Sequence, residues 1–269
     1  MERLIKSRSI DGYDSIVPPG AMKFLEFGRL RLAKGEHYEA EAGRREFVGD
    51  VFAGEVTILV TRPGQPDAPL ISVGSRKDVF SGPPAMFYLP PHSSFRIEAV
   101  SDSADLGLFS AASEGTTPPA VLADVTSVTA GKSNWQRTVY TALGEKFPAE
   151  RLLAGETLNP PGNWSSYPPH KHDRRSLPSE IPMEEVYFFR IDPPQGFGFI
   201  WTYTAEDDPN GFSNVFVVHD GDTVMLPKGY HPVVAAPGYK LHYTWVLAGE
   251  ERRYGAWADD PRHSWVKNA

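Results

Sequence analysis

Proline and glycine interrupt this chain at short intervals. The 269 residues include 25 prolines and 24 glycines, dispersed between short apolar stretches. Because these residues end regular elements and initiate turns, such frequent interruption disfavours long helices and favours many short strands. Hydrophobic residues make up 41% of the chain, which is enough to build a substantial core. The sequence therefore predicts a folded protein that contains either one large all-β domain or two small domains.

The expected strands are short runs rich in β-branched and aromatic residues, each bounded by glycine or proline. They cover residues 24–32, 38–41, 50–61, 85–89, 94–100, 104–111, 186–192, 198–204, 214–218, 223–226, 232–235 and 240–248. Helical periodicity is scarce and predicts only one helix, at 135–143, and a short turn near 148–152. This spacing of strands favours an antiparallel sandwich or barrel over an α/β fold.

The region from residue 162 to residue 231 contains a set of residues suited to binding a metal ion. His170 and His172 form an H-x-H pair, and strand alternation would place both imidazoles on one face. Glu185 begins an apolar strand after a loop long enough for a hairpin, and His231 follows the motif G-x5-P-x-G. Three imidazoles and one carboxylate suit one divalent transition metal and leave it open to oxygen ligands, so that the ion would act as a Lewis acid.

A weak internal repeat suggests that this site is present in only one half of the chain. In each half a strand is followed by a Leu-Pro pair, a short loop and a further strand, at Leu89 and again at Leu226. Aligning these leucines puts Ser94, not His92, opposite His231, and the first half has no H-x-H motif. The repeat predicts two tandem antiparallel β-barrel or jelly-roll domains.

A stretch with the sequence S-E-G-T-T-P-P-A separates the two halves. We therefore expect an N-terminal degenerate barrel at residues 1–122 and a C-terminal metal-binding barrel at residues 123–269.

Charge and composition restrict the partners. The chain has 27 basic and 34 acidic residues, a net charge of −7, and no long block of one sign, so nucleic acid is not expected to bind. It has no cysteine, which excludes disulfides and thiolate ligands. No apolar run approaches the roughly 20 residues of a membrane helix, and no secretory signal is recognisable. We expect a cytoplasmic protein without a membrane partner that binds a small molecule, and a homo-oligomer is an open alternative.

The metal-ligand motifs resemble those of the cupin superfamily with two departures: only Tyr230 separates the last glycine from His231, and the spacing before Glu185 is longer than in most cupins. Longer blocks are more specific: G-N-W-S-S-Y-P-P-H-K-H-D, E-E-V-Y-F-F, P-P-Q-G-F-G-F, D-G-D-T-V-M-L-P-K-G-Y-H-P-V and D-P-R-H-S-W-V. These blocks resemble the 5-deoxy-glucuronate isomerases of myo-inositol catabolism over most of the chain. The resemblance implies an all-β bicupin that binds one divalent ion, zinc or alternatively manganese or iron, through His170, His172, Glu185 and His231.

The resemblance also implies an aldose–ketose isomerase that converts 5-deoxy-D-glucuronate, a uronate, to 5-dehydro-2-deoxy-D-gluconate. The candidate catalytic residues are Tyr187, Tyr203 and His242, and the candidate substrate-binding residues are Lys171, Arg174 and Tyr243. Further cations available to the substrate carboxylate are Arg137 and Arg175. Proton transfer through an enediolate and a hydride shift are both open as routes.

Two segments depart from the pattern of that family. F-G-F-I-W-T-Y-T lacks the more usual Gln-Arg, and H-Y-T-W-V-L-A-G replaces a commoner Y-Y-L-N-V-M-A-G. In the second segment either His242 and Thr244 or Tyr243 and Trp245 face the cavity. The alternative functions are a related uronate isomerase with a different substrate, an iron cupin dioxygenase and a non-catalytic sugar-binding bicupin.

Overall fold

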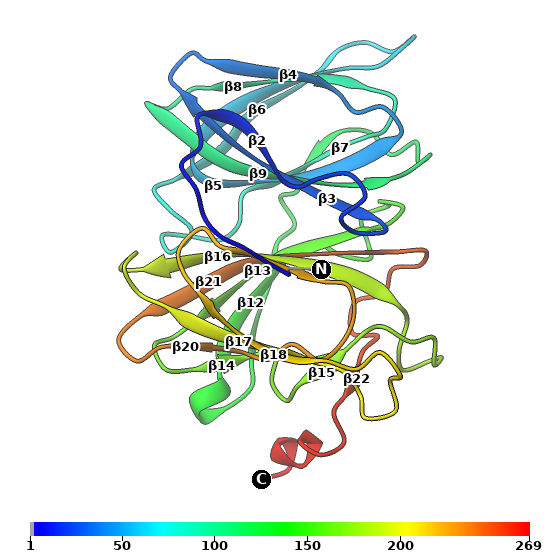
Figure 1. Ribbon diagram of the computed structural model, residues 1–269. Coiled ribbons are helices and arrows are strands. Elements are labelled where there is room, and N and C mark those ends of the chain that lie inside the picture. Colours follow the sequence, from blue (N-terminus) through cyan, green and yellow to red (C-terminus); the bar gives the residue numbers. More distant parts are fainter. Residues whose placement is uncertain (1–2) are drawn as a thin grey trace. The chain divides into compact units, whose positions relative to one another are not determined.

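The structure of the protein, a computed structural model, describes residues 3–269 except for the side chain of Ile71. Within this range the regular elements are β-strands joined by turns, together with two short 3-10 turns, η1 (Ser133–Trp135) and η2 (Ser264–Lys267) (Figure 1). The expectation of an all-β fold is thereby confirmed. No helix in the described part of the chain is long and apolar enough to cross a membrane.

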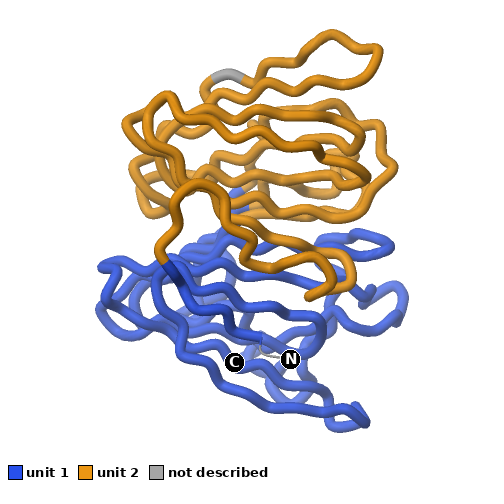
Figure 2. Tube along the Cα trace, turned by 45° about the horizontal axis from the view of Figure 1, so that its top comes forward, with its two compact units in different colours: residues 1–8, 127–140, 156–269 blue, residues 9–126, 141–155 orange. Residues whose placement is uncertain are grey.

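The chain forms two compact units, which Figure 2 distinguishes by colour. The N-terminal unit contains Ser9–Thr126 and Thr141–Gly155, and the C-terminal unit contains Met1–Arg8, Ser127–Tyr140 and Glu156–Ala269. The division expected between residues 122 and 123 lies close to the passage from Thr126 to Ser127. The chain also passes between the units after Arg8, Tyr140 and Gly155, so neither unit is one continuous segment.

The N-terminal unit is one antiparallel sheet with strand order β10-β7-β5-β9-β3-β2, to which β4, β6 and β8 are attached. Its strands are β2 (Gly12–Val17), β3 (Leu25–Ala33), β4 (His37–Glu41), β5 (Arg45–Thr61), β6 (Ala68–Arg76), β7 (Met86–Leu89), β8 (Ser94–Ala99), β9 (Ser103–Ala112) and β10 (Ala120–Val121). The long β5 changes partners along its length, because its first half pairs with β7 and β9 and its second half with β6 and β8. Gly54 lies at this change with φ +85°, where a Cβ would lie 2.2 Å from the Ser103 carbonyl oxygen. Glycine therefore lets β5 bend around the apolar core.

The C-terminal unit contains most of a seven-stranded sheet, order β1-β19-β16-β21-β13-β12-β11, a four-stranded sheet, order β14-β20-β17-β18, and the pair β15-β22. Residue 126 of β11, residues 141–143 of β12 and residues 152–155 of β13 are assigned to the N-terminal unit. The seven-stranded sheet consists of β1 (Leu4–Ile5), β11 (Thr126–Ala130), β12 (Arg137–Leu143), β13 (Leu152–Asn159), β16 (Met183–Asp192), β19 (Thr223–Leu226) and β21 (Lys240–Gly249). The others are β14 (Trp164–Ser165), β15 (His170–Lys171), β17 (Gly198–Tyr203), β18 (Ser213–Val218), β20 (Val233–Ala235) and β22 (Ala258–Asp259). Figure 1 shows that β16 and β21 lie in one layer of this unit and that β14, β17 and β20 lie in the other.

The prediction of a helix at residues 135–143 is wrong. The chain forms the short turn η1 and then strand β12 over most of this range. The segment R-T-V-Y-T-A-L is rich in β-branched and aromatic side chains, which fit a strand better than a helix, and pairing in the seven-stranded sheet decides the outcome. The turn expected near 148–152 is present as a bend at Glu150 and Arg151, immediately before β13.

This bend is held by the buried carboxylate of Glu46, which is 0% exposed. It accepts hydrogen bonds from the backbone N–H groups of Glu150 (2.9 Å), Arg151 (2.7 Å) and Leu152 (3.0 Å) and from the Tyr88 hydroxyl (2.9 Å). One side chain therefore satisfies three backbone donors at the entry to β13.

We expect Glu46→Ala to lower the free energy of unfolding by about 3 kcal/mol, because several buried donors would lose their acceptor at once. Urea denaturation measures this loss. The control is Glu39→Ala, which removes an exposed carboxylate paired with Arg96 and should change stability by less than about 1 kcal/mol. Equal losses in the two variants would contradict the role assigned to Glu46.

Candidate metal centre

His172 is oriented by the backbone of the strand that carries its neighbouring carboxylate. The Met183 N–H donates to the His172 carbonyl oxygen (2.9 Å), and the His172 Nδ1–H donates to the Met183 carbonyl oxygen (2.7 Å). This pairing closes the hairpin expected between the H-x-H segment and Glu185. It also fixes the tautomer, because a proton on Nδ1 leaves the Nε2 lone pair facing Glu185 Oε2 at 3.2 Å.

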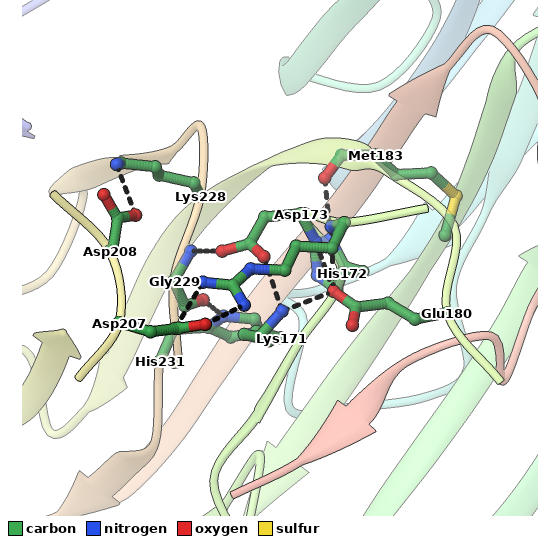
Figure 3. A network of polar contacts seen from close by, with 11 residues as sticks. Lys171, His172, Asp173, Glu180, Met183, Asp207, Asp208, Lys228, Gly229 and His231 are labelled. Carbon is green, nitrogen blue, oxygen red and sulfur yellow. Dashed lines mark hydrogen bonds and ion pairs between the residues drawn. The ribbon is translucent and has the colours of Figure 1, made fainter. Parts of the chain in front are cut away.

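His231 is oriented in a similar way from the opposite side. Its Nδ1–H donates to the Gly229 carbonyl oxygen (2.9 Å), and its Nε2 lies 3.4 Å from Glu185 Oε2. Gly229 has φ +97°, and a Cβ there would lie 2.5 Å from the Tyr203 carbonyl oxygen, so the approach of this loop requires glycine. The Gly229 N–H donates to Asp173 Oδ2 (2.8 Å), which ties this loop to the His172 loop (Figure 3).

The donor atoms of His172, Glu185 and His231 converge, since all lie within 4.8 Å of one another and all three residues are buried. They form the only such group found among residues 3–269. The His231 Nε2 atom is buried and has no hydrogen-bond partner in this part of the chain. Neutral imidazole nitrogens and a carboxylate oxygen aimed at one point fit a divalent metal ion.

His170 lies beside this triad at the other end of the H-x-H segment. Its ring centroid is 4.9 Å from that of His231 and 6.4 Å from that of His172. The pKa of His170 lies well below its usual value, because burial and then the neighbouring His231 and His172 disfavour the charged ring. His170 is thus an uncharged imidazole close to the triad.

The pKa values of the other two histidines shift in opposite directions. Burial alone would lower the pKa of His172, but the Glu185 carboxylate raises it above the ordinary value. Burial lowers the pKa of His231 to about 4, although Glu185 opposes this shift. In the metal-free protein near neutral pH, a proton therefore resides more readily on His172 than on His231.

Tyr187 and Tyr243 lie on the same face as Glu185. Strand register pairs Tyr187 with Trp245 and Phe189 with Tyr243, and alternate residues of β16 and β21 share a face. The Tyr187 and Tyr243 rings are 4.4 Å apart, and the Tyr187 ring is 5.8 Å from His231. Burial, followed by the nearby Glu185 carboxylate, raises the pKa of Tyr187 well above its usual value.

Two residues that the sequence analysis did not select hold these phenols in place. The Tyr243 hydroxyl donates to Ser165 Oγ (3.0 Å), and the Tyr187 hydroxyl lies 3.0 Å from Ser166 Oγ. Both serines belong to the S-S of the N-W-S-S-Y-P-P block. That block immediately precedes the H-x-H pair, and this nearness in sequence was the available signal, although serine alone does not reveal a contact.

The structure does not bring His242 to the triad. Its strand places Tyr243 and Trp245 on the Glu185 face, so His242 lies on the opposite face, opposite Arg190 in register. There its Nε2 is 3.2 Å from Glu156 Oε2. Of the two orientations left open for this strand, the one with Tyr243 and Trp245 on the metal-facing side is adopted.

Tyr203 is engaged elsewhere. Its hydroxyl donates to Asp260 Oδ2 (2.7 Å) and its ring stacks on Trp201 with centroids 3.9 Å apart. Burial and the Asp260 carboxylate raise the pKa of Tyr203, so this phenol keeps its proton. Its contacts support the loops around the site. Tyr203 makes no contact with the triad residues in the described chain.

The two candidate cations for the substrate are already paired with carboxylates. Lys171 is buried and its Nζ lies 2.6 Å from Asp173 Oδ1 and 2.7 Å from Glu180 Oε1 (Figure 3). Arg174 is exposed and forms two hydrogen bonds with Asp207, at 2.6 and 2.8 Å. Lys171 therefore holds together the polar contacts around the site.

A pocket of about 360 Å³ adjoins the histidine segments. Pro169 and Pro232, which neighbour His170 and His231 in the chain, lie in its wall. The remaining lining residues are Asn134, Trp135, Trp164, Tyr167, Trp201, His263 and Val266. Its aromatic walls are of a kind that packs against the apolar faces of small ligands.

A family model described as the KduI/IolB family matches residues 6–266. The chain belongs to this family. It is 41% identical over 247 residues to the 5-deoxy-glucuronate isomerase of Geobacillus kaustophilus HTA426, across 91% of this chain and 86% of that protein.

Solved structures agree with this membership. The crystal structure of an IolB-like protein from Salmonella typhimurium LT2 superposes with a TM-score of 0.91 at 30% identity and covers 99% of this KduI/IolB chain and 100% of that one. The oxalate decarboxylase of Lactobacillus farciminis gives a TM-score of 0.69 at 10% identity, covering 100% and 91% of the two chains. At that identity the second likeness concerns the fold alone.

We expect metal affinity to fall as the pH is lowered and metal uptake to release protons. The raised pKa of His172 means that an ion must displace a proton from this ring near pH 6.5, whereas His231, with its pKa of about 4, is already neutral there. Calorimetric titration with zinc in buffers of different ionisation enthalpy measures the released protons. An affinity that stays constant between pH 7.5 and pH 5.5 would argue against this ligand set.

Proposed function

We propose that this KduI/IolB-family protein is a metal-dependent 5-deoxy-glucuronate isomerase, which converts 5-deoxy-D-glucuronate to 5-dehydro-2-deoxy-D-gluconate in inositol catabolism. Membership of the family and the 41% identity to a 5-deoxy-glucuronate isomerase support the reaction. The observation that carries the proposal is the buried convergence of His172, Glu185 and His231 on one point. Such a site suits aldose–ketose isomerisation, because a bound ion stabilises the negative charge that develops on two adjacent oxygens.

The proposed ligands are His172, Glu185 and His231, with His170 as the fourth. His170 is uncharged and its ring centroid is 4.9 Å from that of His231, so its imidazole lies beside the triad and is proposed as the remaining nitrogen ligand. Zinc is the proposed ion, because imidazole and carboxylate donors without any thiolate are compatible with it, and manganese or iron are the alternatives.

Bound at these residues, a divalent ion supplies Lewis-acid chemistry to the carbonyl and the neighbouring hydroxyl of a sugar acid. The protein residues then have separate tasks. Tyr187 retains its proton because its pKa is raised, so we assign it as a hydrogen-bond donor to a substrate oxygen and not as the base. Tyr243 shares this face and orients Tyr187 by ring contact.

The arrangement of two β units in one chain supports a bicupin in which only the C-terminal unit is competent. The aligned position of His231 in the N-terminal half is Ser94, which begins β8. Among the described residues no group of metal-ligating side chains was found in the N-terminal unit. We propose that this unit is the degenerate copy.

Recognition of a uronate requires a cation for its carboxylate, and Arg137 is the strongest candidate in the C-terminal unit. The other cations considered near the site are neutralised: Lys171 by Asp173 and Glu180, Arg174 by Asp207, and Arg175 by Glu251. An Arg or Lys that already forms an ion pair gains little by exchanging one carboxylate for another.

Arg137 differs from these cations. Its Nη1 donates only to the carbonyl oxygens of Trp135 (3.3 Å) and Tyr167 (3.4 Å), and its buried Nε has no hydrogen-bond partner in the described chain. The positive charge of Arg137 also contributes to the lowered pKa of His170, which indicates that the two side chains are close. A guanidinium beside the histidines that has no carboxylate partner in the described chain is suited to bind the substrate carboxylate.

Metal-loaded wild-type protein should convert 5-deoxy-D-glucuronate to the ketose with or without oxygen, and His172→Ala should reduce turnover by at least about a thousandfold, because the ion is lost. NMR in deuterated water follows the product, and deuterium at C1 indicates proton transfer instead of hydride shift. Activity that persists after thorough removal of metal would refute the mechanism, and a strict requirement for oxygen would favour the dioxygenase.

Arg137→Gln should raise KM for 5-deoxy-glucuronate about tenfold or more with a smaller change in kcat, because a charge-assisted hydrogen bond to the carboxylate is lost. Steady-state kinetics measure both constants. Arg175→Gln is the matched control, since it removes an exposed arginine paired with Glu251. The same rise in KM for both variants would mean that general positive charge, and not Arg137, attracts the substrate.

A further inference from the structure

Trp245 occupies a position on β21 beside the candidate metal centre. It is 4% exposed and lies directly opposite Tyr187 in the pairing of β16 with β21. Cross-strand partners project to the same side of a sheet, and alternate residues along a strand do so too. Trp245 therefore shares its face with Tyr187, Glu185 and Tyr243.

The indole N–H of Trp245 has no acceptor among the described residues. Its Nε1 is buried, and no residue in the described range 3–269 accepts a hydrogen bond from it. By contrast, Trp201 in the same unit donates its Nε1–H to Ser213 Oγ at 2.9 Å. Buried tryptophan N–H groups usually find an acceptor, because leaving one unpaired costs free energy comparable to a lost hydrogen bond. An unpaired donor on this face points to an acceptor supplied by a ligand.

The surroundings of Trp245 link it to the histidines through a row of aromatic rings. Trp245 stacks on Tyr254 (centroids 5.6 Å apart), Tyr254 meets Trp257 edge to face (5.5 Å), and Trp257 lies 5.1 Å from the His170 ring. Trp245 is also the cross-strand neighbour of Tyr187 on β16, and the Tyr187 ring centroid is 5.8 Å from that of His231. Ring contacts through Tyr254 and Trp257, and the strand pairing with Tyr187, therefore connect Trp245 to the histidines.

The stacking also explains why the N–H direction is fixed. A tryptophan packed face to face against a neighbouring ring and buried in a sheet loses its rotamer freedom on folding, so its donor is aimed before a ligand arrives. Such preorganisation makes a single hydrogen bond effective in selecting between ligands, because an analogue without the acceptor leaves the buried donor unpaired.

We infer that the Trp245 Nε1–H donates a hydrogen bond to an oxygen of the sugar acid bound at the metal centre, which makes Trp245 a specificity-determining residue of this site. The inference rests on the proposed function, since it takes the substrate to be an oxygen-rich acid in contact with the triad. It adds a donor that neither the ligand set nor the tyrosines provide.

The test replaces Trp245 by β-(3-benzothienyl)alanine, introduced by suppression of an amber codon. This residue keeps the size and shape of the two-ring side chain but has sulfur in place of N–H, so packing is retained and only the donor is lost. We expect kcat/KM for 5-deoxy-D-glucuronate to fall about tenfold, the effect of losing one hydrogen bond in a water-excluded site. Bound zinc, measured by atomic absorption, and the thermal unfolding midpoint should stay as in the wild type.

The matched control is the same replacement at Trp265, which is 64% exposed and makes no contact with the triad residues in the described chain. It should leave kcat/KM unchanged. A second test compares Trp245→Asn with Trp245→Leu. Asn is smaller than Trp but still carries an N–H donor, whereas Leu has a volume similar to that of Asn and no donor. Trp245→Asn should therefore retain more activity than Trp245→Leu.

The outcomes separate the inference from the function on which it rests. Unchanged kinetics with the sulfur analogue at Trp245, or equal losses at Trp245 and Trp265, would overturn the assignment of Trp245 while leaving the isomerase intact. Equal activity of Trp245→Asn and Trp245→Leu would also count against it. Zinc-loaded wild-type protein that neither converts nor binds 5-deoxy-glucuronate would overturn the proposed function and the inference together.

Discussion

The Glu185 carboxylate is the group on which the site depends. Its Oε2 lies 3.2 Å from His172 Nε2 and 3.4 Å from His231 Nε2, and all three side chains are almost completely buried. A buried carboxylate is costly unless it is paired, and neutral imidazole nitrogens that present lone pairs to it do not stabilise it. A proton on His172 or a divalent ion between the three groups resolves this conflict. The raised pKa of His172 beside Glu185 is in the direction of the first solution.

The geometry of the triad is maintained by a second polar cluster centred on Glu180. Its Oε1 accepts hydrogen bonds from Lys171 Nζ (2.7 Å) and from the backbone N–H groups of Asp173 (2.8 Å) and Arg174 (2.9 Å). Asp173 in turn accepts from Lys171 and from the Gly229 N–H (Figure 3). The cluster thus connects the chain after His172 to the loop before His231. Because a single buried ammonium serves both carboxylates, the loss of Lys171 would leave Asp173 and Glu180 without their counter-charge.

The sequence was sufficient for the elements of the site whose geometry is local. The H-x-H spacing, the hairpin to Glu185 and the glycine before His231 follow from strand alternation and turn chemistry, and the structure brings His172, Glu185 and His231 together. It was not sufficient where partners are distant in sequence. Arg174 meets Asp207, 33 residues later, and nothing near Arg174 indicates that it is already paired. Strand β13 was missed because L-L-A-G-E-T-L-N has weak strand propensity and is fixed by its neighbours in the sheet.

The remaining ambiguity came from strands that are buried on both faces. Every residue of β21 after Lys240 is buried, and nearly all of β16 is buried as well. Alternation of polar and apolar residues identifies the inward face only when the other face meets water, so it could not distinguish His242 from Tyr243. Register resolves the matter because Glu185 is a ligand candidate of known direction and β21 is antiparallel to its strand. Counting in steps of two from Glu185 reaches Tyr187, whose partner is Trp245, and places His242 behind the sheet. The same register places the unpaired indole N–H of Trp245 on this face, among packed aromatic rings. A buried donor without an acceptor is an exception in a well-packed protein, so it marks a place where a ligand can supply the acceptor.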